Sequence, residues 1–460
     1  MIQKLGEICD FHSGNAWKAS KFKEEGIPII RINNMKPNAT DFKYWDWEED
    51  YDPKYFVNEG DILVSLSGTI KTYKWVGEKA LLNQRIVRVT PKEDVNIDWV
   101  YYQISNVIER ISDKGKDAVI KNVSVNDLKK YEVEVPDLPT QNKIVTLLDK
   151  ASALVQEREK SIALLDVLLR AQFLDMFGDP VLNPKGWEIN KFIDLCTKIT
   201  DGTHKTPKYL NEGIPFISAK NLKGNKIYWD DIKYVSEEES TFINKRCNVE
   251  KGDILLTKSG SLGQPAIIDV DFKFSVFESL ALIKYKRDRL NNSFLLAFLE
   301  SEAVLFLYKR RTKGVAVKHL HLIDIKSIPI ITPPISLQNQ FETIYLNIQV
   351  QKETLTQSKN DLENLYDSLL QRAFNGQLNF NVDAELDVLL AAIDIDKENN
   401  DIRDIATVYA SRLLERLDSQ DFETQAQYQQ AKQVAFQMLK EGAIEQEYDT
   451  KNSAVKMKLA

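Results

Sequence analysis

Two short segments of this chain combine hydroxyl side chains, glycines and lysine in a way that suits contact with phosphate. The first is Ser65-Leu66-Ser67-Gly68-Thr69-Ile70-Lys71, and the second is Thr257-Lys258-Ser259-Gly260-Ser261-Leu262-Gly263. Glycine lets backbone N–H groups approach an anion closely, while serine, threonine and lysine are common donors to phosphate oxygens. The Gly-x-x-x-x-Gly-Lys-Ser/Thr pattern of nucleotide hydrolases is absent from the sequence. Both segments therefore suit a nucleic-acid backbone, and a plain turn is the alternative.

Other polar side chains follow predicted strands or form basic runs. Arginine and lysine suit guanine edges and asparagine suits adenine, so the strand-end residues are candidates for base reading: Arg31, Asn33, Asn34 and Lys36 in the first half, and Ser218, Lys220 and Asn221 in the second. The basic runs supply candidate phosphate contacts at Lys116, Lys121, Arg310, Arg311, Lys313 and Lys318. A solvated loop is the alternative for each group.

Catalytic and metal-binding patterns are missing from the sequence. Its 4 histidines include no His-Glu-x-x-His pattern, and its 3 cysteines include no Cys-x-x-Cys pair. His319 and His321 are two residues apart on a predicted strand, and this single pair does not predict a metal site. The Asn-Pro-Pro-Tyr motif of amino-methyltransferases is also absent. We therefore expect no catalysis and no metal on this chain.

The elements that would position these residues occur twice. Gly26-Ile27-Pro28 returns as Gly213-Ile214-Pro215, Gly60-Asp61-Ile62-Leu63 as Gly252-Asp253-Ile254-Leu255, and Gln141-Asn142 as Gln338-Asn339. The order is the same in both halves and the separation grows slowly, so the repeating unit is a whole domain. Cys9 and Cys196 hold equivalent positions and are expected to be twin core residues. In each Gly-Asp-Ile-Leu segment, glycine should supply a positive φ before a buried strand.

Each copy is predicted to be a mixed α/β (α+β) domain followed by one long helix. Short β-rich runs alternate with turns, and each copy has one helical stretch, near Trp99–Ser112 and Ser293–Arg310. The expected boundaries are 1–139 for the first domain, 140–178 for its helix, 179–186 for a linker, 187–334 for the second domain and 335–376 for its helix. The acidic segment 377–460 is predicted to be a helical extension.

The two long helices each carry an apolar stripe that needs a partner. Its positions recur mostly by three and four residues or by their sum of seven, at Ile144, Leu148, Val155, Ile162 and Leu165 in the first helix and Ile344, Ile348, Leu355, Leu362 and Leu369 in the second. The stripes most economically bury against each other. Arg158 interrupts the first stripe, and Gln351 and Ser358 interrupt the second. In an antiparallel coiled coil, Arg158 would come opposite the neighbourhood of Ser358, so the polar interruptions would meet near the middle.

The charge distribution neither supports nor excludes nucleic-acid binding. The net charge is −7, and residues 381–460 hold 16 acidic and 9 basic residues, so the repeated body is neutral. The sequence has no apolar run long enough to span a membrane and does not begin like a signal peptide. We therefore expect a cytoplasmic protein without a membrane partner.

Taken together, these segments resemble the DNA-specificity subunits of type I restriction-modification enzymes. The resemblance extends over residues 1 to about 380 and rests on a combination of motifs: Thr200–Pro207, the paired Gly-Asp-Ile-Leu segments, the Pro-x-Leu-Pro-x-Gln and Pro-x-x-x-Leu-Gln helix starts, Met176–Pro180 and Leu370–Gly376. It adds Thr203, His204 and Lys205 to the candidate DNA contacts. The first copy has Phe11-His12-Ser13-Gly14-Asn15 in place of the Asp-Gly-Thr-His segment, so the two domains are expected to read different sequences.

The resemblance implies a non-catalytic reader of double-stranded DNA. Two target-recognition domains would each read half of a split, asymmetric site, and the helices would act as spacer and docking surface. Two methyltransferase subunits with S-adenosylmethionine, and two motor-nuclease subunits with ATP and Mg²⁺, are the implied partners, and no cofactor is expected on this chain. A coiled-coil scaffold whose twin domains bind proteins is the alternative.

Overall fold

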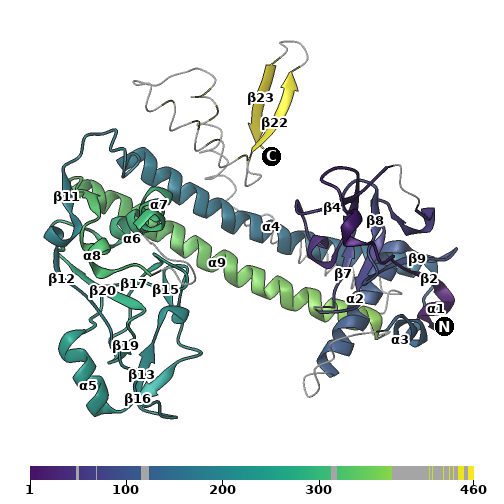
Figure 1. Cartoon of the computed structure of the whole chain (residues 1–460), viewed down its shortest axis with the longest axis horizontal. Coiled ribbons are helices and arrows are strands. Elements are labelled where there is room, and N and C mark those ends of the chain that lie inside the picture. Colours follow the sequence, from purple (N-terminus) through teal and green to yellow (C-terminus); the bar gives the residue numbers. More distant parts are fainter. Residues whose placement is uncertain are drawn as a thin grey trace, which may run out of the picture. The chain divides into compact units, whose positions relative to one another are not determined.

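The computed structural model (Figure 1) divides the chain into two compact units. Unit 1 contains Met1–Glu159 and Gln357–Asn400, and unit 2 contains Lys160–Thr356 and Asp401–Ala460. Each unit therefore holds one copy of the repeat and half of each long helix. The residues that the structure describes are 1–47, 51–68, 70–114, 124–311 and 319–375, with Leu414, Leu417, Tyr428, Lys432, Ala435, Leu439, 444–449 and 454–459.

The domain of unit 1 is built on two four-stranded sheets, ordered β2-β9-β6-β7 and β4-β3-β8-β5. All neighbours are antiparallel except β3 and β8, which are parallel. A third pair, β1-β10, closes the domain next to its long helix. The strands are β1 (Ile2–Lys4), β2 (Cys9–Ser13), β3 (Ile27–Ile30), β4 (Lys43–Trp45), β5 (Phe56–Val57), β6 (Ile62–Ser65), β7 (Thr72–Lys74), β8 (Ala80–Leu82), β9 (Ile86–Pro91) and β10 (Glu132–Glu134), and the helices are α1 (Leu5–Ile8), α2 (Ile97–Lys114) and α3 (Val125–Lys130).

The domain of unit 2 repeats this plan with β12-β20-β17-β18 and β16-β13-β19. Its parallel pair is β13 and β19, equivalent to β3 and β8, and β11-β21 replaces β1-β10. Its strands are β11 (Ile189–Lys191), β12 (Cys196–Asp201), β13 (Ile214–Ile217), β14 (Leu222–Lys223), β15 (Lys226–Ile227), β16 (Lys233–Val235), β17 (Ile254–Thr257), β18 (Pro265–Ile267), β19 (Ser275–Val276), β20 (Leu280–Tyr285) and β21 (Pro329–Ile331). Its helices are α5 (Glu237–Arg246), α6 (Asn292–Glu300), α7 (Glu302–Arg311) and α8 (Leu322–Lys326).

The repeated sequence signals have the structural causes expected of them. Gly60 and Gly252 adopt φ of 88° and 85°, and the apolar residues that follow them enter buried strands. Gly26 adopts φ of 140°, and a Cβ there would lie 2.1 Å from the carbonyl oxygen of Trp45. Cys9 and Cys196 are both buried, and desolvation raises the pKa of each thiol to about 12. The two cysteines are therefore the twin core residues that the repeat predicted.

Helices α4 (Leu138–Phe177) and α9 (Ile335–Phe374) are the two predicted long helices. In unit 1, the start of α4 and the end of α9 share one apolar core with the domain, which includes Leu148, Ala151 and Leu369. Further along, Leu154 packs with Leu362. Positions that ascend along α4 thus meet positions that descend along α9, as Figure 1 shows, and the predicted antiparallel coiled coil is confirmed.

In the same unit, the polar interruptions of the two stripes are in contact. Arg158 is buried, and its Nε donates to Ser358 Oγ at 3.0 Å. The neighbouring pair, Lys359 Nζ and Glu159 Oε1, is 2.9 Å apart. Because a buried guanidinium is costly to leave without partners, this contact favours one register of the two helices.

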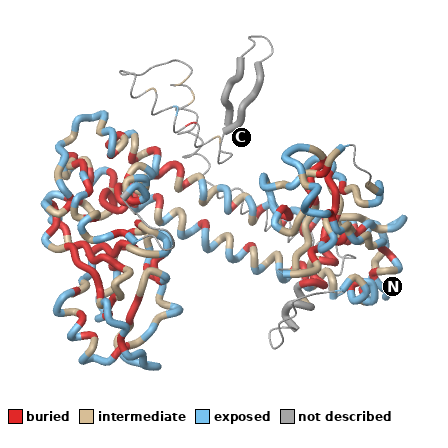
Figure 2. The backbone as a smooth tube through the Cα atoms, in the orientation of Figure 1, coloured by how far each residue is buried: buried red, intermediate tan, exposed pale blue. Residues whose placement is uncertain are grey.

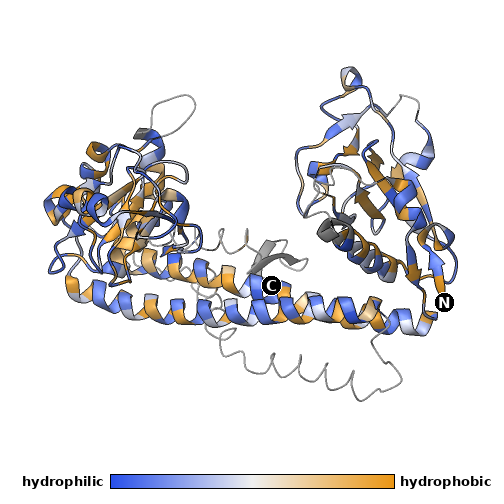
Figure 3. Ribbon diagram, turned by 90° about the horizontal axis from the view of Figure 1, so that it is seen from below, coloured by the Kyte–Doolittle hydropathy of each residue, from blue (hydrophilic) through white to orange (hydrophobic). Residues whose placement is uncertain are grey.

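Unit 2 contains the other halves of both helices. Phe173 and Phe177 of α4 pack on Phe341 of α9 at ring-centroid distances of 5.6 and 5.4 Å, and all three belong to the core of the second domain. Lys352 of α9 contacts Asp166 of α4 at 2.5 Å. Buried positions recur along both helices (Figure 2), with apolar and polar residues alternating (Figure 3). Each domain core thus contains the ends of two helices.

Three sequence predictions need correction. The helical stretch Ser293–Arg310 is interrupted at Ser301, which separates α6 from α7. His321 lies at the N-terminus of α8 and not on a strand. The extension 377–460 is not wholly helical, since β22 (Ile444–Asp449) pairs antiparallel with β23 (Ala454–Leu459). Polar and apolar residues alternate from Val455 to Leu459 in β23, and a period of two is typical of strands.

The described residues contain no helix that is long and apolar enough to cross a membrane. Within the extension, positions 414, 417, 428, 432, 435 and 439 are helical, and the rest of segment 377–443 lies outside the described residues.

Candidate nucleic-acid interface

Loops from several strands meet at one end of the main sheet in unit 2. The N–H of Lys258 donates to the carbonyl of Ser279 at 2.7 Å, that of Glu278 to Thr203 at 3.1 Å, and that of Phe277 to Ile217 at 2.9 Å. These bonds join the segments after β12, β13 and β17 to the turn before β20. We call this group of loops corner 2, and it comprises residues 201–206, 217–221, 258–263 and 276–279.

The same three bonds recur in unit 1 between different residue types. The N–H of Leu66 donates to Arg85 at 3.0 Å, that of Gln84 to Asn15 at 2.9 Å, and that of Asn83 to Ile30 at 3.3 Å. We call this group corner 1, and it comprises residues 13–16, 30–36, 66–68, 70–71 and 83–85. The equivalent bonds show that Leu66 corresponds to Lys258, and Gln84 to Glu278.

A glycine lets the loops approach at both corners. A Cβ on Gly14 would lie 2.2 Å from the carbonyl oxygen of Asn83, and one on Gly202 would lie 1.9 Å from that of Val276. Any residue with a Cβ atom would clash at these distances, so only glycine fits at these two positions. The backbone frame of the corners is therefore fixed by glycine, while the side chains around it differ between the copies.

Most predicted DNA contacts in the described residues lie at these corners. The partly or fully exposed ones are Arg31, Asn33, Lys36, Ser67 and Lys71 at corner 1, and Thr203, His204, Lys205, Lys220, Lys258, Ser259 and Ser261 at corner 2. Three of these cationic side chains also contact groups within their own domain. Arg31 Nη2 and Asp41 Oδ2 are 3.2 Å apart, Lys220 Nζ and Asp231 Oδ2 are 2.7 Å apart, and Lys71 Nζ contacts the carbonyl of Met35.

Two of the predicted base-reading asparagines, Asn34 and Asn221, are buried instead. Asn34 Oδ1 accepts from the N–H of Arg31 at 3.0 Å, and Asn221 Oδ1 accepts from that of Ser218 at 3.0 Å. Each Nδ2 also donates to the carbonyl of an acidic residue further along the chain, Asp41 or Asp231. The two amides stabilise equivalent turns, so their burial contradicts a base-reading role.

The predicted hydroxyl Ser65 is also internal. It is buried, and its Oγ accepts from the N–H of Lys71 at 2.9 Å. Its counterpart Thr257 accepts from the N–H of Gln264 at 2.9 Å. The first hydroxyl of each loop therefore closes the loop and is not available to a phosphate.

Corner 2 contains a buried carboxylate that contacts two cationic side chains and a histidine. Asp201 contacts Lys258 and Arg246, and its Oδ2 is 3.3 Å from His204 Nε2. His204 Nδ1 is also 2.6 Å from Glu278 Oε2. Burial alone would raise the pKa of Asp201, but the hydrogen bond and charge of Lys258, with the charge of Arg246 and the hydrogen bond of His204, lower it below its usual value. Asp201 thus orients cationic groups towards solvent.

Arg246 is a site residue that sequence reasoning missed. It ends α5, whereas the described part of unit 1 has the short 3-10 helix Pro53–Tyr55 between β4 and β5, the equivalent place. The slow growth in separation between the repeated motifs indicated an insertion there, but not that its last residue would reach Asp201. At corner 1 the residue paired across the sheet in the position of Asp201 is Ser13.

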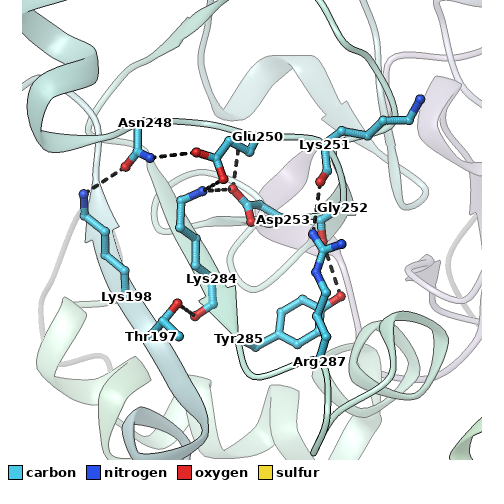
Figure 4. A network of polar contacts seen from close by, with 10 residues as sticks. All are labelled: Thr197, Lys198, Asn248, Glu250, Lys251, Gly252, Asp253, Lys284, Tyr285 and Arg287. Carbon is cyan, nitrogen blue, oxygen red and sulfur yellow. Dashed lines mark hydrogen bonds and ion pairs between the residues drawn. The ribbon is translucent and has the colours of Figure 1, made fainter.

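The Gly-Asp turn before β17 is held by a separate polar network (Figure 4). Lys284 Nζ contacts Asp253 Oδ2 at 2.6 Å and Glu250 Oε2 at 2.8 Å, and Asp253 accepts from the N–H of Glu250 at 3.0 Å. Desolvation raises the pKa of Asp253, whereas the hydrogen bond from Lys284 lowers the pKa of Glu250. In unit 1, the cation beside Asp61 is Arg88, whose Nη1 lies 3.8 Å from Asp61 Oδ2. This network supports a structural role for the turn.

Several predicted contacts lie beyond the two corners. Arg310 is exposed on α7, its guanidinium 5.8 Å from the Phe306 ring centroid. Tyr308 of the same helix packs against Gly263, so α7 adjoins corner 2. Thr69, Lys116, Lys121, Lys313 and Lys318, and the side chain of Arg311, lie outside the described residues. Within the described part of the chain, no cluster of three or more His, Cys, Asp or Glu side chains has the arrangement of a metal site.

Comparison with known proteins identifies the family. Residues 1–164 and 184–364 match the family model described as type I restriction modification DNA specificity domain. The EcoBI specificity subunit of Escherichia coli is 22% identical over 407 residues, which cover 81% of this chain and 85% of that protein. The MjaIX specificity subunit of Methanocaldococcus jannaschii is 25% identical over 354 residues, which cover 70% and 78% of the two chains.

A solved structure from a study of complex assembly and conformational transition in the type I restriction-modification system has the same fold. It matches 82% of this chain and 98% of its own, with a TM-score of 0.52 and 14% sequence identity. The two family matches each contain one copy of the repeat and together span more than half of the sequence. The resemblance that the motifs indicated is confirmed, and the chain belongs to the family of type I restriction-modification DNA specificity subunits.

Proposed function

We propose that this chain reads a bipartite, asymmetric DNA site, with corner 1 on one half and corner 2 on the other. The observation that carries this proposal is that the two corners share the same backbone hydrogen bonds but differ in their side chains. The backbone bonds are the same, yet Ser13 and Leu66 at corner 1 correspond to Asp201 and Lys258 at corner 2. Readers of this kind need a fixed scaffold with variable polar groups, because base edges differ in their pattern of donors and acceptors.

Each corner also offers groups for the DNA backbone. Lys36 and Arg85 are exposed at corner 1, and Lys205 and Lys220 at corner 2. Lysine and arginine that neutralise phosphates give affinity that falls with salt, whereas groups at base edges give sequence preference. The corners combine both kinds of side chain.

The proposal extends to the assembled complex, and membership of the family supports it. In our proposal the antiparallel helices dock two methyltransferase subunits, which bring S-adenosylmethionine and modify adenine. Two motor-nuclease subunits bring ATP and Mg²⁺. This chain then contributes recognition and spacing and no catalytic group. A 40-residue helix such as α4 is about 60 Å long, which exceeds one turn of DNA at about 34 Å.

Selection from a randomised duplex library tests the reading function directly. The purified full-length chain should enrich a motif of two conserved blocks separated by a fixed number of unspecified base pairs. Arg85→Ala should weaken binding through the corner that reads one block, and Lys205→Ala should weaken binding through the corner that reads the other. Enrichment of a single undivided block, or of no sequence at all, would refute the proposal and favour a protein-binding scaffold.

A further inference from the structure

The first turn of each long helix contains a buried glutamine that bonds to the adjoining domain. In α4, Gln141 Oε1 accepts from the N–H of Asn96 at 2.8 Å, and its Nε2 donates to the carbonyl of Pro136 at 2.9 Å. In α9, Gln338 Oε1 accepts from the N–H of Asn291 at 2.8 Å. One side chain thus joins the domain, the connecting segment and the helix.

Gln338 makes one bond more than its counterpart. Its Nε2 donates to the carbonyl of Pro333 at 2.8 Å and to that of Arg289 at 3.0 Å. All the polar atoms of this buried side chain are therefore used. Since a buried amide without partners costs about 1–3 kcal/mol, the helix start has a strong preference for one position on the domain.

A second amide pair completes the arrangement in each unit. Asn96 Nδ2 donates to Asn142 Oδ1 at 2.7 Å, and Asn291 Nδ2 donates to Asn339 Oδ1 at 3.1 Å. Asn96 Oδ1 also accepts from the N–H groups of Asp98 and Trp99 at the start of α2. We call Gln141, Asn142 and Asn96, and likewise Gln338, Asn339 and Asn291, the amide clamps.

We propose that the two amide clamps set the direction in which each recognition domain leaves its helix, and so the spacing between half-sites that the protein accepts. The apolar cores that join each domain to the helices allow small slides and rotations, because dispersion contacts have little directionality. Hydrogen bonds to a fully used amide are directional and fix both angle and position. Gln141 and Gln338 are thus positioning residues that need not touch DNA.

This inference rests on the proposed two-part reading, which gives it a measurable consequence. One added base pair between half-sites moves one of them by about 3.4 Å and rotates it by about 36° around the DNA axis. A protein with rigid domain directions must deform the DNA to follow. We therefore expect wild-type affinity to fall about tenfold for one added base pair, and that of the Gln141→Met/Gln338→Met variant to fall less than about threefold.

The first experiment measures the clamp without DNA. Spin labels on Lys43→Cys and Lys150→Cys report the position of the first domain on α4, since both side chains are exposed and all three native cysteines are buried. Gln141→Met should broaden the distance distribution between the labels. Asn142→Ala removes the exposed member of the clamp and should broaden it less, which keeps the test possible if the glutamine variant folds poorly. An unchanged distribution in both variants overturns the proposal.

The second experiment repeats the library selection with Gln141→Met/Gln338→Met. We expect the same two sequence blocks as for the wild type, separated by a wider range of spacings. Gln103→Met is the matched control, because it alters a buried glutamine inside α2 and should leave the spacing unchanged. Broadened label distances with an unchanged spacing overturn the inference, whereas a wild-type selection without two blocks overturns the proposed function instead.

Discussion

Replacing Asp201 by the serine of the first copy should destabilise unit 2 strongly. The Asp201 side chain is 3% exposed and contacts Lys258, which is 12% exposed. Arg246 and His204, at 57% and 54% exposed, are mostly in water. In Asp201→Ser, Lys258 Nζ can still donate to the carbonyl of Glu278 at 3.1 Å. Its positive charge, however, no longer has the buried carboxylate as a partner.

The magnitude follows from burial. Removing one partner of a buried ion pair costs about 3–5 kcal/mol, whereas an exposed pair contributes about 0–1 kcal/mol, so the Lys258 contact decides the outcome. Because Lys258 is not fully buried, we expect about 3 kcal/mol less free energy of unfolding for unit 2. For a unit of this size, that corresponds to a fall in Tm of about 6–12 °C.

The first copy supplies the control. Leu66 stands where Lys258 stands, so Asp201→Ser/Lys258→Leu transfers a pair that already works in the same frame. The double variant should recover most of the lost Tm in calorimetry. Equal losses in the single and double variants would refute the reasoning, because the damage would then not come from an uncompensated lysine.

The pH dependence has a definite sign. The pKa of Asp201 is lowered in the folded protein, so its ionisation stabilises the fold above the unfolded pKa and this contribution is lost as the pH falls through the folded pKa. The difference in Tm between wild type and Asp201→Ser should therefore be largest near neutral pH and shrink in acid. A difference that grows as the pH falls would contradict the assignment.

Two further substitutions test the roles of buried polar residues. Asn221→Ala should lower the free energy of unfolding by about 1–3 kcal/mol in urea titrations, since it leaves partly buried backbone groups without their side-chain partner. The exposed neighbour change Lys220→Ala should cost less than about 0.5 kcal/mol, and equal effects would argue against the turn-stabilising role. Arg158→Leu should retain or raise the stability of unit 1 but weaken the preference for one register of the two helices. Distances between spin labels on α4 and α9 within unit 1 would reveal a mixture of registers. A single unchanged register would show that Arg158 and Ser358 do not set it.

Much of the architecture was predictable from local patterns. The return of Gly-Asp-Ile-Leu and Gln-Asn in order predicted two copies of one domain, and the three-and-four spacing of apolar residues predicted α4 and α9 to within two residues at each end. The polar residues that interrupt both stripes even indicated which positions meet. Such patterns report a regular backbone period, and period is a property of the sequence itself.

The candidate site was predicted less well. Residue type indicated that Asn34 and Asn221 could read bases, yet both amides turn inward to stabilise short turns. Arg246 drew no attention because its partner Asp201 lies far away in the sequence. Whether an amide or a guanidinium faces solvent depends on the acceptors around it, and these come from other segments.

The sequence by itself determined the duplication, the strand–helix order, the long helices and the family, because repeated motifs and apolar periods are local and survive without neighbours. Only the tertiary structure decided that separate loops converge at two equivalent corners, that Asp201 gathers cations there, and that Gln141 and Gln338 fasten each domain to its helix. Hydrogen bonds and ion pairs depend on distance and direction between residues that are remote in the chain, and those quantities exist only once the chain has folded.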